Sequence, residues 1–309
     1  MDLIKRKQNN ILLHKVNIGE KTVSIPVTRL GSGKGKRVLI TGGVDGDEYT
    51  GIEAAYALIK QYSKIKFDGE LSIIPIVNIP GFEGAVSWNP IDNKYPKHIF
   101  PGKEKGSSTE RLMYWLSSNF VKDIDLWIDL HSGASTEVLD PYVGAYETKN
   151  KQLNEMIRSY LLKVKAERIN FDAYTPIFAE NIAKRKVAKI VLESGQLGQR
   201  NKKDIKQHID WVKQLLSDKK LPKIVKKNVY KNVREFLATQ NGIWIPSLQS
   251  NRVQKGKVLG EVRSLDGKIL QKITAYEAGV FLWRREAMSC KKGDSLYAYA
   301  HQKESFMSC

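Results

Sequence analysis

Apolar residues recur with two different spacings along the first two thirds of the chain. The segments RVLITGG at 37–43 and ELSIIPIVNIP at 70–80 are almost continuously apolar, which is typical of strands buried on both faces of a parallel sheet. The segment TGIEAAYALIKQYSK at 50–64 repeats apolar residues every three or four positions and predicts an amphipathic helix. This alternation predicts an α/β fold, with a mostly parallel or mixed sheet flanked by helices.

The same patterns predict the remaining elements of this region. Further strands are expected at 11–18, 21–30, 125–133 and 188–195, and further helices at 108–121, near 150–166 and at 204–218. Between them, a long loop rich in glycine and proline runs from about 81 to 106. Loops of that length in a compact domain are usually functional or disordered.

The pattern changes near 219–230, where short strands and glycine turns replace the alternation of strands and helices. We therefore predict two domains, an α/β catalytic domain over 1–222 and a small all-β domain of sandwich or barrel type over 223–309. The stretch GSGKGK at 31–36 is expected to be a turn, because a phosphate-binding loop follows a strand and opens a helix, whereas this one precedes a strand.

Composition narrows the class of protein. The chain has 309 residues, 41% hydrophobic and 27% charged, and two cysteines, Cys290 and Cys309. These values are ordinary for a soluble globular protein without a disulfide framework. No apolar run reaches the length of a membrane span, and the first ten residues lack the apolar centre of a signal peptide, so a cytoplasmic location is expected.

The net charge of +18 raises the question of a nucleic-acid partner. The lysines are scattered and lack the aromatic interleaving of a single-strand binding groove. A small-molecule substrate is therefore favoured over a nucleic acid or a membrane. A basic nucleic-acid-binding protein is kept as a third hypothesis, and a homo-oligomer is left open.

Four polar residues stand where predicted strands end. Asp45 and Glu48 follow the strand at 37–43, His131 ends the strand at 125–133, and Glu193 ends the strand at 188–195. Ligands of open α/β sheets bind outside the carboxyl ends of strands, so these side chains are expected to converge. A histidine with carboxylates can hold a divalent metal ion, and a further carboxylate can act as a general base. Each residue alone is more often structural; the four together favour a site.

Three motifs in this order resemble the succinylglutamate desuccinylase/aspartoacylase family, which belongs with the zinc carboxypeptidases (M14-type). They are GGVDGDE at 42–48, DLHSG at 129–133 and VLESGQLG at 191–198, with KHIFPG at 97–102 between the first two. The resemblance covers essentially the whole chain, including the C-terminal β domain. It implies metal ligands at Asp45, Glu48 and His131, a catalytic Glu193, and one zinc ion per chain, or another divalent metal such as manganese.

The chain departs from the family pattern at Asp45, where the family carries a histidine. An added carboxylate ligand makes the site more negative and favours harder ions such as manganese or magnesium. Three interpretations stay open: an altered metal site, a weak zinc site, or a family member that has lost catalysis.

The loop departs as well. An Asn-Arg pair that holds the substrate carboxylate in the family aligns with Lys97 and His98, and a second arginine aligns with Ser87. Lysine is only a point charge, whereas arginine binds a carboxylate in two places. The expected substrate-binding residues are Lys97, His98, Trp88 and Arg111, with Trp88 and Tyr95 forming an aromatic wall.

The resemblance implies a metal-dependent hydrolase that cleaves an amide (N-acyl) or ester bond of a small molecule. Glu193 would take the proton of the attacking water and protonate the leaving amine. Lys97 or His98 would help to stabilise the oxyanion. The alternative is a catalytically impaired family member, a pseudoenzyme, that binds a small ligand without hydrolysing it.

Overall fold

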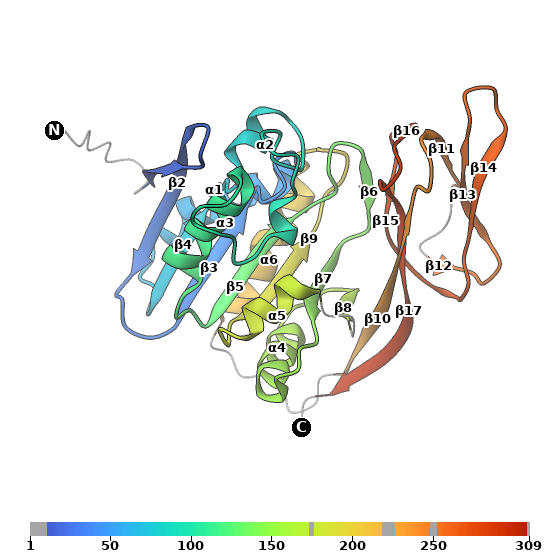
Figure 1. Ribbon diagram of the computed structural model, residues 1–309. Coiled ribbons are helices and arrows are strands. Elements are labelled where there is room, and N and C mark those ends of the chain that lie inside the picture. Colours follow the sequence, from blue (N-terminus) through green and yellow to red (C-terminus); the bar gives the residue numbers. More distant parts are fainter. Residues whose placement is uncertain (1–10, 173–175, 218–225, 248–251, 308–309) are drawn as a thin grey trace.

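The backbone is built around a mixed, 13-stranded sheet (Figure 1). The computed structural model describes residues 11–172, 176–217, 226–247 and 252–307. The strand order in the sheet is β1-β2-β4-β3-β5-β9-β7-β8-β10-β17-β15-β12, and β6 pairs with β15. The strands of its first half are β1 (Ile11–Asn17), β2 (Thr22–Gly31), β4 (Glu70–Ile74), β3 (Arg37–Gly42), β5 (Leu126–His131) and β9 (Ala188–Glu193).

The centre of this sheet is parallel. Strands β4, β3, β5 and β9 pair in parallel register, with Gly42 opposite Leu130 and His131 opposite Glu193. Every residue of β5 is buried, as expected for a strand at the centre of a parallel sheet. The carboxyl ends of β3, β5 and β9 therefore lie side by side, as the sequence predicts.

Three short strands were not expected from the sequence. They are β6 (Glu137–Leu139), β7 (Tyr142–Tyr146) and β8 (Ile169–Asp172). Strand β7 runs antiparallel to β9 and parallel to β8, so the sheet is mixed rather than wholly parallel. Segments of three to five residues carry too little period-2 signal to be recognised.

Helices cover both faces of the sheet (Figure 1). Helices α1 (Tyr49–Tyr62), α4 (Lys151–Lys163) and α6 (Lys202–Leu216) contribute to one apolar core with the strands. Helix α3 (Ser108–Leu116), its π-helical continuation Ser117–Val121 and α5 (Ile177–Ala183) contribute to a second core. The predicted helices at 50–64, 108–121, near 150–166 and at 204–218 are thus confirmed. The long loop contains the short helix α2 (Ile79–Glu83) and the 3-10 turn Pro96–His98.

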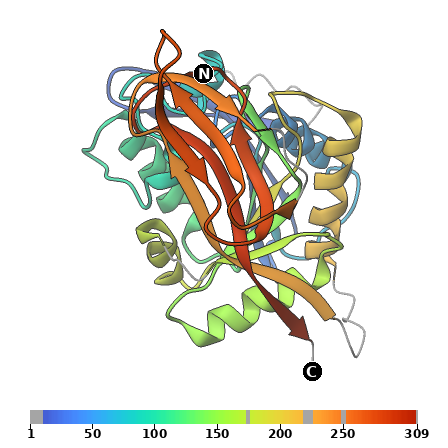
Figure 2. The ribbon, with the colours of Figure 1, turned by 90° about the vertical axis from the view of Figure 1, so that its right-hand side faces the viewer.

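The C-terminal part is all β, as expected (Figure 2). Four of its strands continue the large sheet: β10 (Lys226–Leu237), β17 (Ser295–Met307), β15 (Gly279–Arg285) and β12 (Arg252–Val253). The others form a second, antiparallel sheet in the order β14 (Ile269–Thr274), β13 (Val258–Arg263), β11 (Gly242–Pro246), β16 (Ser289–Cys290). Residues of both sheets, among them Trp244 and Tyr297, share one core.

Strand β10 pairs with β8, so the β-rich part is joined to the α/β part by hydrogen bonds within one sheet. The predicted domain boundary at 222/223 lies outside the described residues and stays a prediction. The predicted turn at 31–36 is confirmed, since it joins β2 to β3. Among the described residues, no helix is both long and apolar enough to cross a membrane.

Helix α6 is fixed to the central sheet by a buried histidine. His208 is 0% exposed, and its Nε2 lies 3.1 Å from the carbonyl oxygen of Ser194, which follows β9. Burial lowers the pKa of His208 from 6.5 to about 4. The folded protein therefore keeps this imidazole neutral, while the unfolded chain takes up a proton as the pH falls below 6.5.

We expect the free energy of unfolding to fall as the pH is lowered from about 6.5 to about 4, by up to about 3 kcal/mol from this group. Urea unfolding at several pH values would measure it. His208→Gln should lose this part of the pH dependence, and identical pH profiles of the wild type and the variant would contradict the assignment.

Candidate functional site

The predicted metal-binding residues meet at the carboxyl ends of β3 and β5. Asp45 and Glu48 lie between β3 and α1, and His131 is the last residue of β5. One ligand atom from each residue lies within 4.8 Å of the others, and all three side chains are buried. Glu193, the last residue of β9, is opposite His131 in the ladder. The structure therefore brings together the four residues that the sequence placed at strand ends.

Two close approaches of the backbone allow this convergence. A Cβ atom on Gly46 would lie 2.1 Å from the carbonyl carbon of Gly81, so the acidic loop can rest on α2 only with glycine there. A Cβ atom on Gly51 would lie 2.5 Å from the carbonyl oxygen of Leu130. Helix α1 can therefore begin directly against the end of β5.

His131 is held between two carboxylates. Its Nδ1 lies 2.8 Å from Oε2 of Glu48, and its Nε2 lies 3.1 Å from Oδ2 of Asp129. Glu48 also accepts a hydrogen bond of 2.9 Å from the backbone NH of Ser132. Burial alone would lower the pKa of His131, but Glu48 and Asp129 outweigh it and raise the pKa well above its usual value. Burial raises the pKa of Glu48, and His131 opposes that shift.

Asp129 connects His131 to the two neighbouring strands of the sheet. Its Oδ1 accepts a 2.6 Å hydrogen bond from Thr41 on β3, and its Oδ2 lies 2.7 Å from Nζ of Lys189 on β9. Burial alone would raise the pKa of Asp129, but Lys189 and His131 hold it well below its usual range. Such a carboxylate fixes the ring orientation of a histidine and, with it, the direction of the opposite nitrogen.

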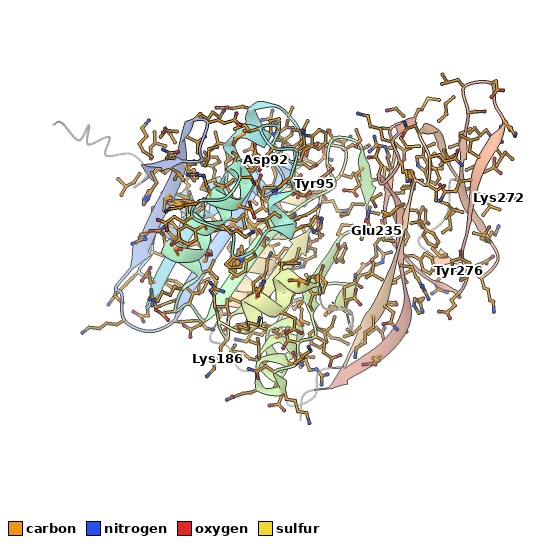
Figure 3. All side chains as sticks on the ribbon, viewed as in Figure 1. Asp92, Tyr95, Lys186, Glu235, Lys272 and Tyr276 are labelled. Carbon is orange, nitrogen blue, oxygen red and sulfur yellow. The ribbon has the colours of Figure 1, made fainter. Side chains whose placement is uncertain are left out.

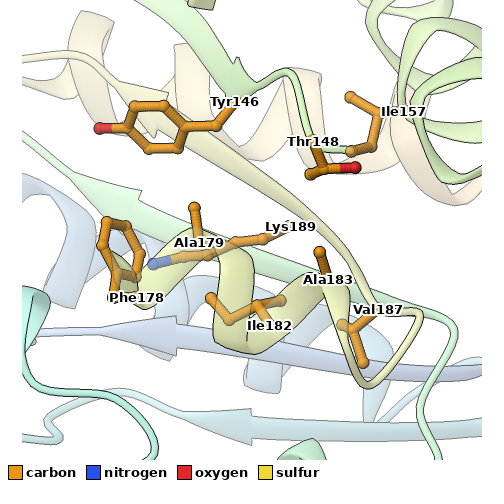
Figure 4. A pocket seen from close by; sticks show the side chains of 9 residues that line it. All are labelled: Tyr146, Thr148, Ile157, Phe178, Ala179, Ile182, Ala183, Val187 and Lys189. Atoms are coloured by element: carbon orange, nitrogen blue, oxygen red, sulfur yellow. The ribbon is translucent and has the colours of Figure 1, made fainter. Parts of the chain in front are cut away.

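Lys189 also lines a small cavity on the other side of its side chain (Figure 4). Its nitrogen lies over the ring of Phe178, 5.1 Å from the centroid, and Tyr146 and Ile182 line the same space. The cavity holds about 20 Å³, which is room for about one water molecule. It is too small for a substrate.

Lys97 contacts Asp45, which the sequence gives no reason to expect. Its ammonium nitrogen lies 2.5 Å from Oδ2 of Asp45, whose side chain is 0% exposed. Burial alone would lower the pKa of Lys97, but Asp45 and then Glu48 outweigh it and raise the pKa well above its usual value. Lys97 is therefore a charged ammonium group at one of the three candidate ligands.

The predicted aromatic wall is formed by the same loop. The ring centroids of Trp88 and Tyr95 lie 6.0 Å apart, and those of Tyr95 and His98 also lie 6.0 Å apart. Nζ of Lys97 lies 5.5 Å from the centre of the Tyr95 ring. Figure 3 labels Tyr95 and Asp92 on this loop. Trp88, Lys97 and His98, predicted to bind substrate, are thus gathered beside the candidate ligands.

Arg111 has its described contacts elsewhere. Its Nε donates a 2.8 Å hydrogen bond to the carbonyl oxygen of Gly106, and the same atom would lie 3.5 Å from a Cβ atom on Gly19. The guanidinium group therefore packs at the turn between β1 and β2. The contact of Arg111 with substrate stays a prediction.

Two further carboxylates and one tyrosine line the same region. Burial raises the pKa of Glu193 to about 7, opposed by His131 and Lys97. Burial raises the pKa of Glu137 to about 7 as well. Tyr142 lies opposite Glu193 in the β7–β9 ladder. Sequence reasoning missed Glu137, Tyr142 and Lys189; only Lys189 gave a signal, as a charged residue inside an apolar strand.

The loops around the site are tied together by Asp47. Its Oδ1 accepts a 2.7 Å hydrogen bond from the hydroxyl of Ser87. Its Oδ2 accepts hydrogen bonds of 3.0 and 2.8 Å from the backbone NH and the hydroxyl of Ser135. Asp47 is therefore a clamp between three loops. Ser87, aligned with a family arginine, serves this clamp.

The long loop is fixed at its other end by Asp92. Its carboxylate accepts hydrogen bonds from the Ser107 hydroxyl at 2.6 Å and from the backbone and hydroxyl of Thr109 at 2.8 and 2.6 Å. Ser107 is the N-cap of α3, and Thr109 lies in its first turn. The loop that carries Trp88, Tyr95 and Lys97 is thus held by buried and half-buried carboxylates, and its Phe100 also packs in the second apolar core.

Comparison with known proteins gives consistent matches. Residues 34–218 match the sequence model of the succinylglutamate desuccinylase/aspartoacylase catalytic domain. An N-alpha-acetyl-L-2,4-diaminobutyric acid deacetylase of Halomonas elongata is 34% identical over 124 residues, which are 40% of this chain and 36% of that protein. The alignment therefore spans only about a third of that relative.

Solved structures share the fold over nearly their whole length. The product-bound ectoine utilization protein EutE (DoeB) of Ruegeria pomeroyi superposes with a TM-score of 0.77 at 22% identity, covering 94% of both chains. A succinylglutamate desuccinylase/aspartoacylase of Rhodobacter sphaeroides gives a TM-score of 0.76 at 20% identity, covering 99% of both chains. These neighbours confirm the predicted fold class.

The clamp by Asp47 leads to a stability prediction. Asp47→Asn should lower the free energy of unfolding by about 1–3 kcal/mol, because buried hydrogen bonds to a charged acceptor are lost and an amide group faces donors. Urea unfolding would measure the change. Asp68→Asn, at an exposed position, is the matched control and should stay within about 0.5 kcal/mol. Equal stability of the two variants would show that Asp47 does not hold the loops.

Proposed function

Because the chain belongs to the succinylglutamate desuccinylase/aspartoacylase family, we propose that it is a metal-dependent hydrolase of an amide (N-acyl) or ester bond in a small molecule. The observation that carries the proposal is the convergence of Asp45, Glu48 and His131 within 4.8 Å, with Glu193 on the neighbouring strand end. Separate strand ends supply these groups, which is how active sites of open α/β sheets are assembled.

The residues fit a divalent metal ion. Oδ1 of Asp45 is buried and has no hydrogen-bond partner among the described residues, so its lone pairs are available to a metal ion. Two carboxylates and one imidazole suit zinc or manganese, and the contact of His131 with Asp129 is the usual support of a metal-binding histidine. Asp45, Glu48 and His131 would hold one ion per chain. When bound, the ion would polarise the acyl carbonyl and acidify water.

Glu193 is the proposed proton carrier. Its Oε2 is buried and has no hydrogen-bond partner among the described residues, so a lone pair is available to a substrate water. Glu193 would accept a proton from this water as its oxygen bonds to the carbonyl carbon. It would then give the proton to the nitrogen or oxygen that leaves when the scissile bond breaks. The Lys97 ammonium and His98 would stabilise the developing oxyanion.

A deacetylase is the favoured kind of hydrolase. The relative from Halomonas elongata carries that name for an N-acetylated diamino acid, and EutE (DoeB) is named for ectoine utilisation. The aromatic wall of Trp88 and Tyr95 would pack against the apolar part of a substrate of this size. An N-acetylated amino acid or diamino acid is therefore the first substrate class to assay.

A second candidate function is ligand binding without hydrolysis. The observation that favours it is the ion pair between Lys97 and Asp45, since an ammonium group at a ligand oxygen opposes a metal cation. The two candidates differ in metal content and in turnover, and both can be measured on the wild-type protein.

The role of Glu193 leads to a sharp kinetic prediction. Glu193→Gln should reduce turnover of an N-acetylated substrate by about 100-fold or more, because general acid–base transfer is lost, while bound metal stays near the wild-type level. The matched control is Glu53→Gln, a partly exposed residue of α1, which should keep wild-type turnover. Turnover within about twofold of the wild type in Glu193→Gln would exclude this role.

Metal content tests the ligand set. Protein purified without added metal should carry near-stoichiometric zinc or manganese in inductively coupled plasma mass spectrometry, and His131→Ala should lose it, because one of three donors is removed. A wild-type protein that takes up neither ion after incubation would support the second candidate function instead.

A further inference from the structure

The two oxygens of the Asp45 carboxylate have different surroundings. Oδ2 lies 2.5 Å from the ammonium nitrogen of Lys97. Oδ1 is buried and has no hydrogen-bond partner among the described residues. One oxygen is thus held by an internal cation, and the other is left with its lone pairs in a site where Glu48 and His131 present two further donors.

The position of Lys97 is set from two directions. The residue lies in the 3-10 turn Pro96–His98, so its side chain extends from the loop to the carboxylate. The Tyr95 ring lies 5.5 Å from its nitrogen, a distance at which an aromatic face attracts an ammonium group. Lys189, the other lysine with charge partners in this region, is paired with Asp129. Lys97 is therefore the cation that faces Asp45.

Lys97 changes the charge of the donor set. Two carboxylates, a neutral imidazole and a divalent ion have charges that sum to zero. With the ammonium of Lys97 included, the sum becomes +1, the value for a site with only one carboxylate ligand. Positive charge beside a reacting carbonyl stabilises the oxyanion that forms there, but it also repels a metal cation.

We propose that Lys97 is a positioning residue that serves as the built-in counter-cation of Asp45, fixing this carboxylate through Oδ2 and setting the net charge of the metal site. This inference rests on the proposed function, in which Asp45 is a metal ligand. Asp45 and Lys97 then act as one unit, a charged ligand with its own neutralising group. The unit trades metal affinity for positive charge at the reacting carbonyl.

The trade-off gives a signature that a merely structural ion pair lacks. Lys97→Met removes the repulsion and should tighten zinc binding by about tenfold or more. The same variant, saturated with zinc, should lose turnover by about tenfold or more, because a charge near the oxyanion is removed. Lys97→Arg keeps the charge and should keep zinc affinity within about threefold of the wild type.

The experiment is a zinc titration against a chromophoric chelator, with the turnover of each zinc-saturated variant measured in parallel. The control is Lys103→Met, which removes the same charge from an exposed lysine paired with Glu110 and should leave both quantities unchanged. Asp45→Asn combined with Lys97→Met removes both charges and shows, by urea unfolding, whether the folded state survives loss of the pair.

The outcomes separate this inference from the proposed function. Tighter zinc binding with slower turnover in Lys97→Met supports it. Zinc affinity in Lys97→Met that equals or falls below that of a wild type able to bind zinc and hydrolyse substrate overturns the counter-cation role and leaves the hydrolase intact. No zinc binding and no turnover in any folded variant overturns both.

Discussion

The buried carboxylate of Asp129 joins the three strands on which the site is built. Its side chain is 0% exposed, yet it contacts Thr41 on β3, His131 on its own strand and Lys189 on β9. A charge inside an apolar sheet is tolerated only when it is paired and hydrogen-bonded. The parallel register that places Thr41 opposite Asp129 supplies these partners. A shift in the register of either neighbouring strand would leave the buried Asp129 carboxylate without partners and would release His131.

The sheet fixes the positions of the site residues at the strand ends, and the loops around them form the rest of the site. The strand ends fix His131 and Glu193, while Asp47 and Asp92 fix the loops through serine and threonine donors. A loop keeps one conformation when its polar groups are satisfied and its apolar groups are packed. The loop from α2 to α3 meets both conditions, because Asp92 has donors at the start of α3 and Phe100 packs in the second core. The aromatic wall and Lys97 therefore hold defined positions.

Much of this arrangement could be predicted from the sequence. Almost continuous apolar runs identified β3 and β4, and mainly apolar segments identified β5 and β9. Their parallel order placed Asp45, Glu48, His131 and Glu193 together. Asp129 and His131 are two positions apart in one strand and therefore lie on the same side of it, and the structure joins the two by a direct contact. The short strands β6 to β8 were missed because three to five residues carry no clear period. The contact of Lys97 with Asp45 was missed because it joins residues 52 positions apart, and a loop lysine has no local signature.

The acidic loop at the exit of β3 is consistent with a strongly basic chain once each acid is assigned its partners. Asp45 is neutralised by Lys97, Asp47 is satisfied by hydroxyl and backbone donors, and Glu48 is satisfied by His131 and the Ser132 backbone. Asp45 and Glu48 face the same site, with ligand atoms within 4.8 Å of each other, and Lys97 and His131 offset their mutual repulsion. Asp47 points away from this site, toward Ser87 and Ser135. Because burial removes water as a partner, each carboxylate needs a partner from another element of the fold. The local sequence therefore shows that three acids lie in this loop, but partners from other elements determine which carboxylate oxygen is left without a hydrogen bond.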